Sequence, residues 1–277
     1  MNDNLNISLA LCGRIDTFDL DIEFTMPLVG ITALFGPSGC GKTTILRCLA
    51  GLHKLPGNVT IGNEVWQNDK IFTPSYKRSV GYIFQEANLF SHLSVRENLN
   101  YGAQRATKHP LKESFQFDDV VDMLALKHLL NRSTISLSGG ERQRIAIGRA
   151  ILAQPRLLLM DEPLSALDHK SKRAIFSCFE RLHEDFNLPI LYVSHDINEI
   201  TKLADRMIVL DNGNKIAEGL TADIILQQNL RTSVSARIVR HDPDKKLTWI
   251  DYNGQTLSIP LQDDDIGSQL KIDIHSG

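Results

Sequence analysis

The fold of this chain is decided by the stretch Ile31-Thr32-Ala33-Leu34-Phe35-Gly36-Pro37-Ser38-Gly39-Cys40-Gly41-Lys42-Thr43-Thr44. Its first part is a short apolar run that predicts a buried strand, and the residues after Thr44 have the spacing of a helix. A Gly-x4-Gly-Lys-Thr loop between a strand and a helix is the setting of the phosphate-binding loop. The stretch therefore predicts an α/β domain that binds a nucleotide, and an ordinary glycine-rich turn is the weaker alternative.

The loop supplies the phosphate contacts that such a domain needs. Its glycines allow backbone N–H groups to converge on phosphate oxygens, and the following helix N-terminus adds a partial positive charge. Lys42 is expected to reach the β- and γ-phosphates, and the Thr43 hydroxyl is expected to ligate Mg²⁺. The residues assigned to the nucleotide are Gly36, Pro37, Ser38, Gly39, Cys40, Gly41, Lys42, Thr43 and Thr44.

The composition is that of a globular protein. Hydrophobic residues make up 42% and charged residues 23% of the 277 residues, which argues against wholesale disorder. A formal net charge of −3 argues against a nucleic-acid binder driven by a basic surface. The 4 cysteines are scattered, which favours reduced thiols over disulfides or a zinc site. Without a signal-peptide pattern or a spanning stretch, we expect an intracellular protein that reaches a membrane only through a partner.

Short apolar runs alternate with helical patterns along most of the chain, which is typical of a parallel sheet covered by helices on both faces. The predicted strands are Ile31–Phe35, Val80–Phe84, Leu157–Met160, Ile190–Val193, Met207–Leu210 and, after a turn at Gly213, Lys215–Glu218. Between about residues 86 and 147 helical periodicity dominates, and this predicts a helical subdomain inserted into a nucleotide-binding domain of residues 1–230.

The pattern changes again from residue 231 onward. Short alternating segments are separated by Asp-Pro and Asn-Gly turns, which predicts a further group of strands. These segments are Ala236–Val239, Leu247–Tyr252, Thr256–Ile259 and Leu270–Ile274. We expect residues 231–277 to form the start of a small C-terminal β-domain, with too little chain to close it into a barrel.

Two carboxylates follow the predicted strand Leu157–Met160. Because the C-terminal ends of parallel strands line the ligand crevice, Asp161 and Glu162 are expected beside the phosphates. Asp161 suits Mg²⁺, and Glu162 suits the general base that polarises the attacking water. A plain loop start is the alternative for this pair when it is considered alone, and the phosphate loop makes that alternative the weaker one.

Three further candidates are weaker when each is taken alone. Leu137-Ser138-Gly139-Gly140-Glu141 predicts a helix start, with Ser138 as N-cap and Glu141 completing a capping box, and a helix N-terminus of this kind also attracts anions. His195 and Gln85 each follow a predicted buried strand. A lone histidine is usually structural, but at this edge of the sheet His195 becomes a candidate γ-phosphate contact, and Gln85 a candidate for Mg²⁺ or the attacking water.

Taken together and in this order, the motifs resemble those of the ATP-binding cassette (ABC) ATPases over about residues 5–230. The resemblance implies a P-loop (RecA-like) core and a head-to-tail homodimer that closes over two ATP molecules. Each ATP is then held by one phosphate loop and by the partner's signature motif, and the helical subdomain docks on membrane permease subunits. The implied residues are Glu162, His195 and Gln85 for catalysis, Thr43, Gln85 and Asp161 for Mg²⁺, Ser138, Gly139 and Gly140 for the partner's ATP, and Ser165–Asp168 as the D-loop.

A narrower resemblance concerns the cargo. Phe84–Leu99, Leu137–Ala150 and Pro189–His195 are similar to segments of molybdate-importer ATP-binding subunits, and the tail from Ala236 is similar to the start of their C-terminal Mop/TOBE-like β-domain. This implies an ATP hydrolase that drives molybdate uptake from the cytoplasmic face of the inner membrane, as a peripheral subunit. A periplasmic or extracellular substrate-binding protein would deliver the oxyanion. Sulfate, tungstate or another small solute is the runner-up cargo.

The sequence departs from the cassette pattern at two places. Glu141 stands where many cassette ATPases have Gln, although the importer branch that the chain resembles often has Glu there. The aromatic residue that usually stacks on adenine is not obvious at the expected spacing, and Phe18 is the nearest candidate.

Other classes of nucleotide-binding protein explain the motifs less well. Cassette ATPases of DNA repair separate the phosphate loop from the signature by long coiled-coil arms, whereas no extended heptads occur here. Translation-factor types carry two cassettes in one chain, and an exporter half normally carries its own membrane spans. A plain P-loop kinase or GTPase would leave the signature segment and His195 unexplained, so we expect no nucleic-acid partner and no intrinsic span.

Overall fold

The computed structural model of the chain describes residues 6–15, 17–106, 115–165, 167–228, 230, 232–243, 245, 247–252, 255–262 and 264–274. The chain divides into two compact units, Met1–Ile224 (unit 1) and Ile225–Gly277 (unit 2). The division lies within helix α7 (Thr221–Gln227), shortly before the boundary expected at residue 230.

Within its described residues, unit 1 contains one sheet of ten strands in the order β5-β4-β1-β2-β10-β9-β3-β8-β7-β6. Their bounds are β1 Asn6–Ile15, β2 Phe18–Pro27, β3 Ile31–Phe35, β4 Gly57–Ile61, β5 Glu64–Gln67, β6 Val80–Ile83, β7 Leu157–Asp161, β8 Ile190–Val193, β9 Arg206–Asp211 and β10 Asn214–Leu220. Strands β9, β3, β8, β7 and β6 pair in parallel, as predicted.

The predicted parallel strands agree with the observed ones within two residues at each end. Strands β3 and β8 have the predicted bounds, β6 ends at Ile83 instead of Phe84, and β7 continues to Asp161. Every residue of β7 is buried. Such a strand reads as a continuous apolar run because helices cover both faces of the sheet. Its final residue, Asp161, is a buried carboxylate at the carboxyl ends of the parallel strands, the edge at which sheets of this kind usually bind ligands.

The other strands of the sheet pair mostly antiparallel, and the sequence analysis predicted only β10 among them, which lies antiparallel to β9. Strand β1 pairs with β2 and β4, and β4 pairs with β5. Buried and exposed residues alternate along β2, with Leu20, Ile22, Phe24 and Met26 inside. One hydrophobic core joins these strands to the first helix, α1 (Lys42–Leu49), and to the parallel strands. The antiparallel half thus fixes the helix that follows the phosphate loop.

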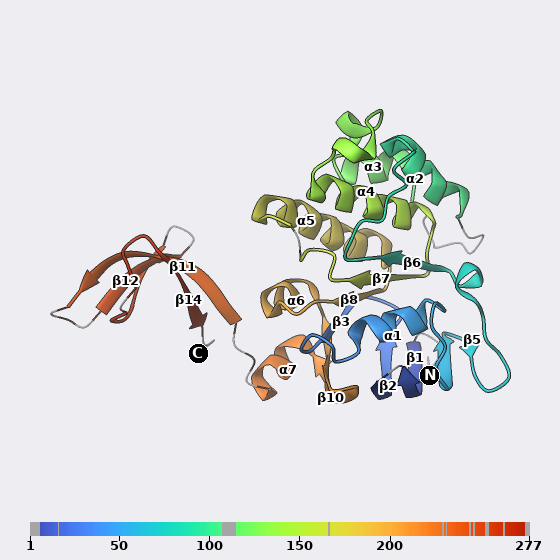
Figure 1. Ribbon diagram of the computed structural model, residues 1–277, viewed down its shortest axis with the longest axis horizontal. Helices are drawn as coiled ribbons and strands as arrows, with labels where there is room; N and C mark the ends of the chain where they lie inside the picture. Colours follow the sequence, from blue (N-terminus) through green and yellow to red (C-terminus); the bar gives the residue numbers. More distant parts are fainter. Residues whose placement is uncertain are drawn as a thin grey trace. The chain divides into compact units, whose positions relative to one another are not determined.

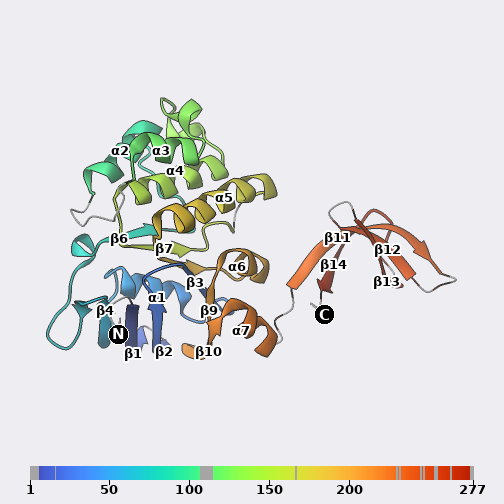
Figure 2. The ribbon, with the colours of Figure 1, turned by 180° about the vertical axis from the view of Figure 1, so that it is seen from behind.

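The helices are α1, α2 Val95–Gln104, α3 Phe117–Met123, α4 Gly139–Leu152, α5 His169–Phe186, α6 Ile197–Leu203 and α7. Figures 1 and 2 show α2, α3 and α4 gathered at one end of unit 1, away from β1 and β2. A Cβ at Gly102 would lie 2.1 Å from Arg149 O, so this glycine lets α2 and α4 approach closely. The described residues between β6 and β7 contain helices and no strand, as predicted for the insertion.

Unit 2 is a small antiparallel sheet in the order β13-β12-β11-β14. Its strands are β11 Thr232–Asp242, β12 Leu247–Tyr252, β13 Gln255–Pro260 and β14 Gln269–Ile274, and each contains one of the predicted segments. Ile238 and Ile250 form its buried centre. Among the residues that the structure describes, no helix is both long and apolar enough to cross a membrane.

Candidate nucleotide-binding and hydrolysis site

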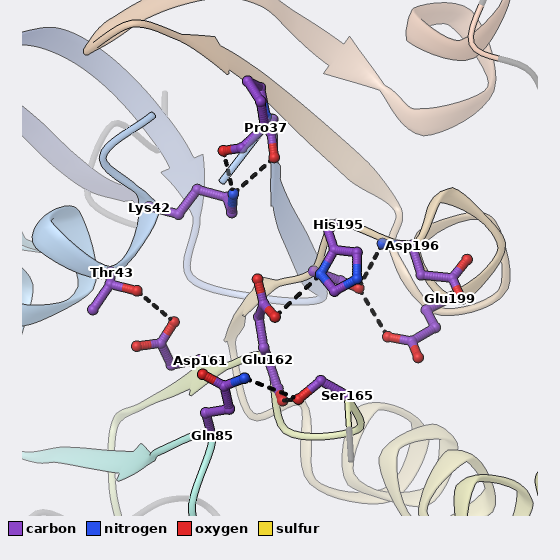
Figure 3. Close-up of polar contacts among 12 residues, drawn as sticks. Pro37, Lys42, Thr43, Gln85, Asp161, Glu162, Ser165, His195, Asp196 and Glu199 are labelled. Carbon is purple, nitrogen blue, oxygen red and sulfur yellow. Dashed lines mark hydrogen bonds and ion pairs between the residues drawn. The ribbon is translucent and has the colours of Figure 1, made fainter. Parts of the chain in front are cut away.

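The predicted phosphate loop connects β3 to α1, and its backbone leaves a cradle above the N-terminus of that helix. Gly41, the N-cap of α1, has a φ of 106°, a conformation that side-chain-bearing residues rarely adopt. Lys42 Nζ donates hydrogen bonds to the carbonyl oxygens of Gly36 at 2.7 Å and Pro37 at 2.8 Å (Figure 3). The lysine side chain therefore folds back over the loop that it follows.

The charge of Lys42 shows that the loop fits an anion. Its side chain is almost entirely buried, and no carboxylate among the described residues forms an ion pair with it. A buried charge is costly unless an opposite charge compensates it. The phosphates of a nucleotide would supply that charge at the N-terminus of α1, where the helix dipole also favours an anion.

A cavity of about 450 Å³ opens beside the loop. Loop residues such as Ser38, Lys42 and Thr43 line it on one side, and Phe18, Arg47 and Glu162 line other parts. This volume lies within the range of ~300–1,000 Å³ that is usual for small-molecule sites. The cavity therefore has room for the nucleotide whose phosphates the loop would hold.

Asp161 lies directly against the loop, as the sequence predicts. Its Oδ1 accepts a hydrogen bond from Thr43 Oγ1 at 2.9 Å, and its Oδ2 accepts one from Tyr82 OH at 3.1 Å (Figure 3 shows the first). Burial raises the pKa of the Asp161 carboxyl, and these two hydrogen bonds oppose the rise. A hydroxyl beside a carboxylate fits Mg²⁺, which usually takes one or two protein ligands together with phosphate oxygens and water.

Glu162 and His195 face each other at the same edge of the sheet. The distance from His195 Nδ1 to Glu162 Oε2 is 3.1 Å, and the Glu162 side chain is mostly buried, with 19% of it exposed. Glu162 has a φ of 46°, a left-handed conformation that is uncommon for residues other than glycine. Hydrogen bonds from Glu162 N to Val193 O and from Ser165 to Glu162 O hold it there. The unusual backbone turns the carboxylate toward the cavity.

Gln85 lies near these acids but makes a different contact. Its Nε2 donates to Ser165 Oγ at 3.4 Å, and Ser165 in turn donates to the carbonyl oxygen of Glu162 (Figure 3). Gln85 is therefore tied to the segment after Glu162, and its predicted contact with Mg²⁺ or the attacking water stays a prediction.

The signature segment is not part of this cavity. Ser138 Oγ accepts a hydrogen bond from Glu141 N at 3.3 Å, and Ser138 N donates to Glu141 Oε2 at 2.8 Å, so the predicted capping box is confirmed. The backbone hydrogen bond from Ser138 lowers the pKa of Glu141. Ser138 and Gly139 are exposed, and a Cβ at Gly139 would meet no atom within 4 Å. Neither these residues nor Gly140 lines the cavity in the same chain.

The sequence analysis missed several residues around the site, among them Tyr82, Arg47 and Glu199. Tyr82 donates a hydrogen bond to Asp161, Arg47 lines the cavity, and Glu199 accepts a hydrogen bond from Ser194, directly before His195. Arg47 could have been predicted from the sequence, because it lies four residues after Thr43 and therefore on the same face of α1.

The fold and the site together define a P-loop ATPase domain with a helical insertion. The chain belongs to the ABC transporter family, whose model matches residues 20–165. It is 48% identical to the molybdenum import ATP-binding protein ModC of Rhodopseudomonas palustris, over 92% of this chain and 70% of that protein. It is 46% identical to the ModC protein of Rhodobacter capsulatus, over 96% of this chain and 75% of that protein.

Solved structures show the same fold. CbiO1 of Clostridium perfringens, part of the ABC transporter complex cbiONQ, has a TM-score of 0.70 and 24% identity, over 82% of this chain and 93% of that chain. The ATP-binding cassette MJ0796, solved as a dimer in a post-hydrolysis state with ADP and Pi, has a TM-score of 0.65 and 25% identity. The match covers 78% of this chain and 98% of that chain.

Proposed function

We propose that this chain is the ATP-binding subunit of an importer that uses ATP hydrolysis to take up molybdate through a membrane permease. The observation that carries the proposal is the identity of 46–48% to molybdenum import ATP-binding proteins over almost the whole chain. The site supports it with an anion cradle, a Thr43–Asp161 pair and a Glu162–His195 pair at one edge of the sheet.

Each residue of the site has a chemical task in this proposal. Lys42 and the loop N–H groups hold the β- and γ-phosphates, while Thr43 and Asp161, with Gln85, hold Mg²⁺. The ion supplies positive charge that offsets the charge developing on the phosphates. Glu162 accepts a proton from the water whose oxygen attacks the γ-phosphorus, while the bond from that phosphorus to the β–γ bridging oxygen breaks and ADP leaves. His195 contacts the γ-phosphate and orients the Glu162 carboxylate, which lies 3.1 Å from its ring nitrogen.

A second copy of the chain completes each site. We assign Ser138, Gly139 and Gly140, at the N-terminus of α4, to the γ-phosphate of an ATP held by the partner, because Ser138 and Gly139 are exposed there in the single chain. Gly140 is buried beside Ser171. We further propose that the helical subdomain of residues 86–147 docks on the permease at the cytoplasmic face of the inner membrane. A separate substrate-binding protein then delivers the oxyanion, and no nucleic acid takes part. Residues 231–277 form part of a Mop/TOBE-like domain.

Phe18 is the residue we assign to the adenine ring. It lines the cavity and is half-buried, and a Cβ on Gly41 would lie 3.1 Å from its ring. Phe18→Ala is expected to weaken ATP binding by about 1–3 kcal/mol, or roughly 5- to 150-fold in Kd, because stacking on a base contributes that much. Titration with a fluorescent ATP analogue measures the change. Phe18→Tyr should bind normally, and so should Tyr76→Ala, which removes an exposed aromatic ring elsewhere. Unchanged binding in Phe18→Ala would remove the assignment.

The cargo is tested by uptake. The chain is reconstituted with its permease and binding protein in liposomes that contain ATP, and the entry of labelled molybdate, tungstate and sulfate is measured. Molybdate uptake is expected with the wild-type chain. It should disappear when the Lys42→Ala variant is used in its place. Uptake of sulfate alone, or of none of the three anions, would contradict the proposed cargo while leaving ATP hydrolysis in place.

A further inference from the structure

Glu199 is a buried glutamate that contacts Ser194, the residue before His195 of the Glu162–His195 pair. The proposed nucleotide contacts give it no role. It belongs to α6, and its side chain is only 7% exposed. Its Oε1 accepts from Lys172 Nζ at 2.6 Å, and its Oε2 accepts from Tyr192 OH at 2.7 Å and from Ser194 Oγ at 2.9 Å. One carboxylate therefore joins groups from α5, from β8 and from the residue directly after β8.

The residues directly before and after His195 both take part in hydrogen bonds of this group. Ser194 precedes it and donates to Glu199, and the backbone N–H of Asp196, which follows it, donates to Ser194 Oγ at 3.0 Å. Figure 3 shows the imidazole of His195 between this group of contacts and Glu162. The backbone on both sides of His195 is thus tied, through one hydroxyl, to a single buried charge.

The same carboxylate also reaches the segment after Glu162. Lys172 lies in the first turn of α5, where its backbone N–H donates to Asp168 O at 2.9 Å, and Asp168 ends the D-loop. The ion pair Lys172–Glu199 therefore connects the end of the D-loop to the turn that carries His195. A buried ion pair of this kind adds little net stability, because desolvation offsets much of the attraction, and fixing one geometry is its better-attested use.

We infer that Glu199 is a positioning residue for ATP hydrolysis, which acts by holding His195 against Glu162 through Ser194 and by coupling that turn to α5 through Lys172. This inference rests on the proposed role of His195. It assigns no contact with ATP to Glu199 itself. It predicts that loss of the Glu199 charge or of the Ser194 hydroxyl impairs the chemical step and leaves nucleotide affinity largely unchanged.

The test uses Glu199→Gln, which keeps the shape of the side chain, and Ser194→Ala, which removes only the bridge to the turn. Both are expected to lower kcat by ~10-fold or more, because a small misplacement of an aligned group can cost up to ~10²-fold. The KM for ATP should stay close to that of the unchanged chain. Glu64→Gln is the matched control, because it removes a glutamate from the Arg156 ion pair, which lies outside the site.

A double-mutant cycle separates positioning from general destabilisation. In a His195→Ala background, Glu199→Gln is expected to have no further effect on kcat, since a residue that acts through His195 has nothing left to orient. In addition, the ring resonance of His195, assigned by its loss in His195→Ala, should shift in Glu199→Gln and Ser194→Ala and stay in place in Glu64→Gln. If Glu199→Gln does not fold, Ser194→Ala provides both readouts.

Two different failures can be told apart. Normal hydrolysis by His195→Ala would remove the proposed role of His195 and this inference with it. Impaired hydrolysis by His195→Ala, together with normal kcat in Glu199→Gln and Ser194→Ala, would overturn only the inference. An effect of Glu199→Gln that adds fully to that of His195→Ala, with an unmoved His195 resonance, would likewise show a merely structural role.

Discussion

Glu162→Gln is expected to bind ATP with nearly unchanged affinity, to accumulate as an ATP-bound closed dimer and to lose ~10²–10⁴-fold in kcat. The amide has the size of the carboxylate and can still form a hydrogen bond with His195, so the geometry of the pair should persist. It cannot accept a proton from the attacking water. Hydrolysis therefore stops after binding, and the dimer that hydrolysis would open remains closed.

Steady-state phosphate release, ATP titration and size-exclusion chromatography with ATP check the three parts of this prediction. Glu64→Gln serves as the control because it has the same change of charge at an ion pair outside the site. It should hydrolyse ATP normally and should not accumulate as a dimer. Near-normal turnover in Glu162→Gln would show that another group takes the proton.

The parallel half of the sheet was predictable because burial on both faces leaves an unbroken apolar run. Strands β3 and β8 could be placed to the residue on this basis. Strands β1, β2, β4 and β5 were missed although β2 carries a period-two signal, with Leu20 and Ile22 inside and Asp19 and Asp21 outside. The alternation continues through Phe24 and Met26 and is typical of a half-buried strand, so the signal was present but was overlooked in a search for continuous apolar runs. Pairing with β1 confirms the strand.

The same physics explains how far the site could be predicted. The carboxyl ends of parallel strands meet at one edge of the sheet. The sequence alone therefore predicted that Asp161, Glu162 and His195 lie near one another. Their mutual distances could not be predicted, because the left-handed backbone of Glu162 is held partly by a hydrogen bond to Val193 O, which lies far along the chain. Glu199 reads in the sequence as a polar residue of a short helix. Its burial depends on three partners contributed by other elements.

Ser138→Arg is expected to abolish ATP-driven dimerisation while leaving the affinity of the single chain for ATP largely intact. Ser138 lies at the exposed N-terminus of α4, and neither it nor the glycines after it line the cavity formed by the same chain. An arginine there would occupy the space that the partner's γ-phosphate needs in the proposed dimer. Light scattering with ATP, in the hydrolysis-deficient Glu162→Gln background, measures dimerisation, and titration below the dimerising concentration measures affinity.

The chain contains a matched control for this substitution. Ser94 caps α2 with the same capping box, in which Glu97 N donates to Ser94 Oγ at 3.3 Å, the distance found for Glu141 N and Ser138 Oγ. Loss of either serine cap costs the helix ~1 kcal/mol. Ser94→Arg therefore reproduces the damage to a helix end without touching the proposed composite site, and it should dimerise normally. If Ser138→Arg and Ser94→Arg weaken dimerisation equally, cap loss explains the result. If Ser138→Arg lowers the ATP affinity of the single chain, the signature segment acts on its own nucleotide, and the composite site is wrong.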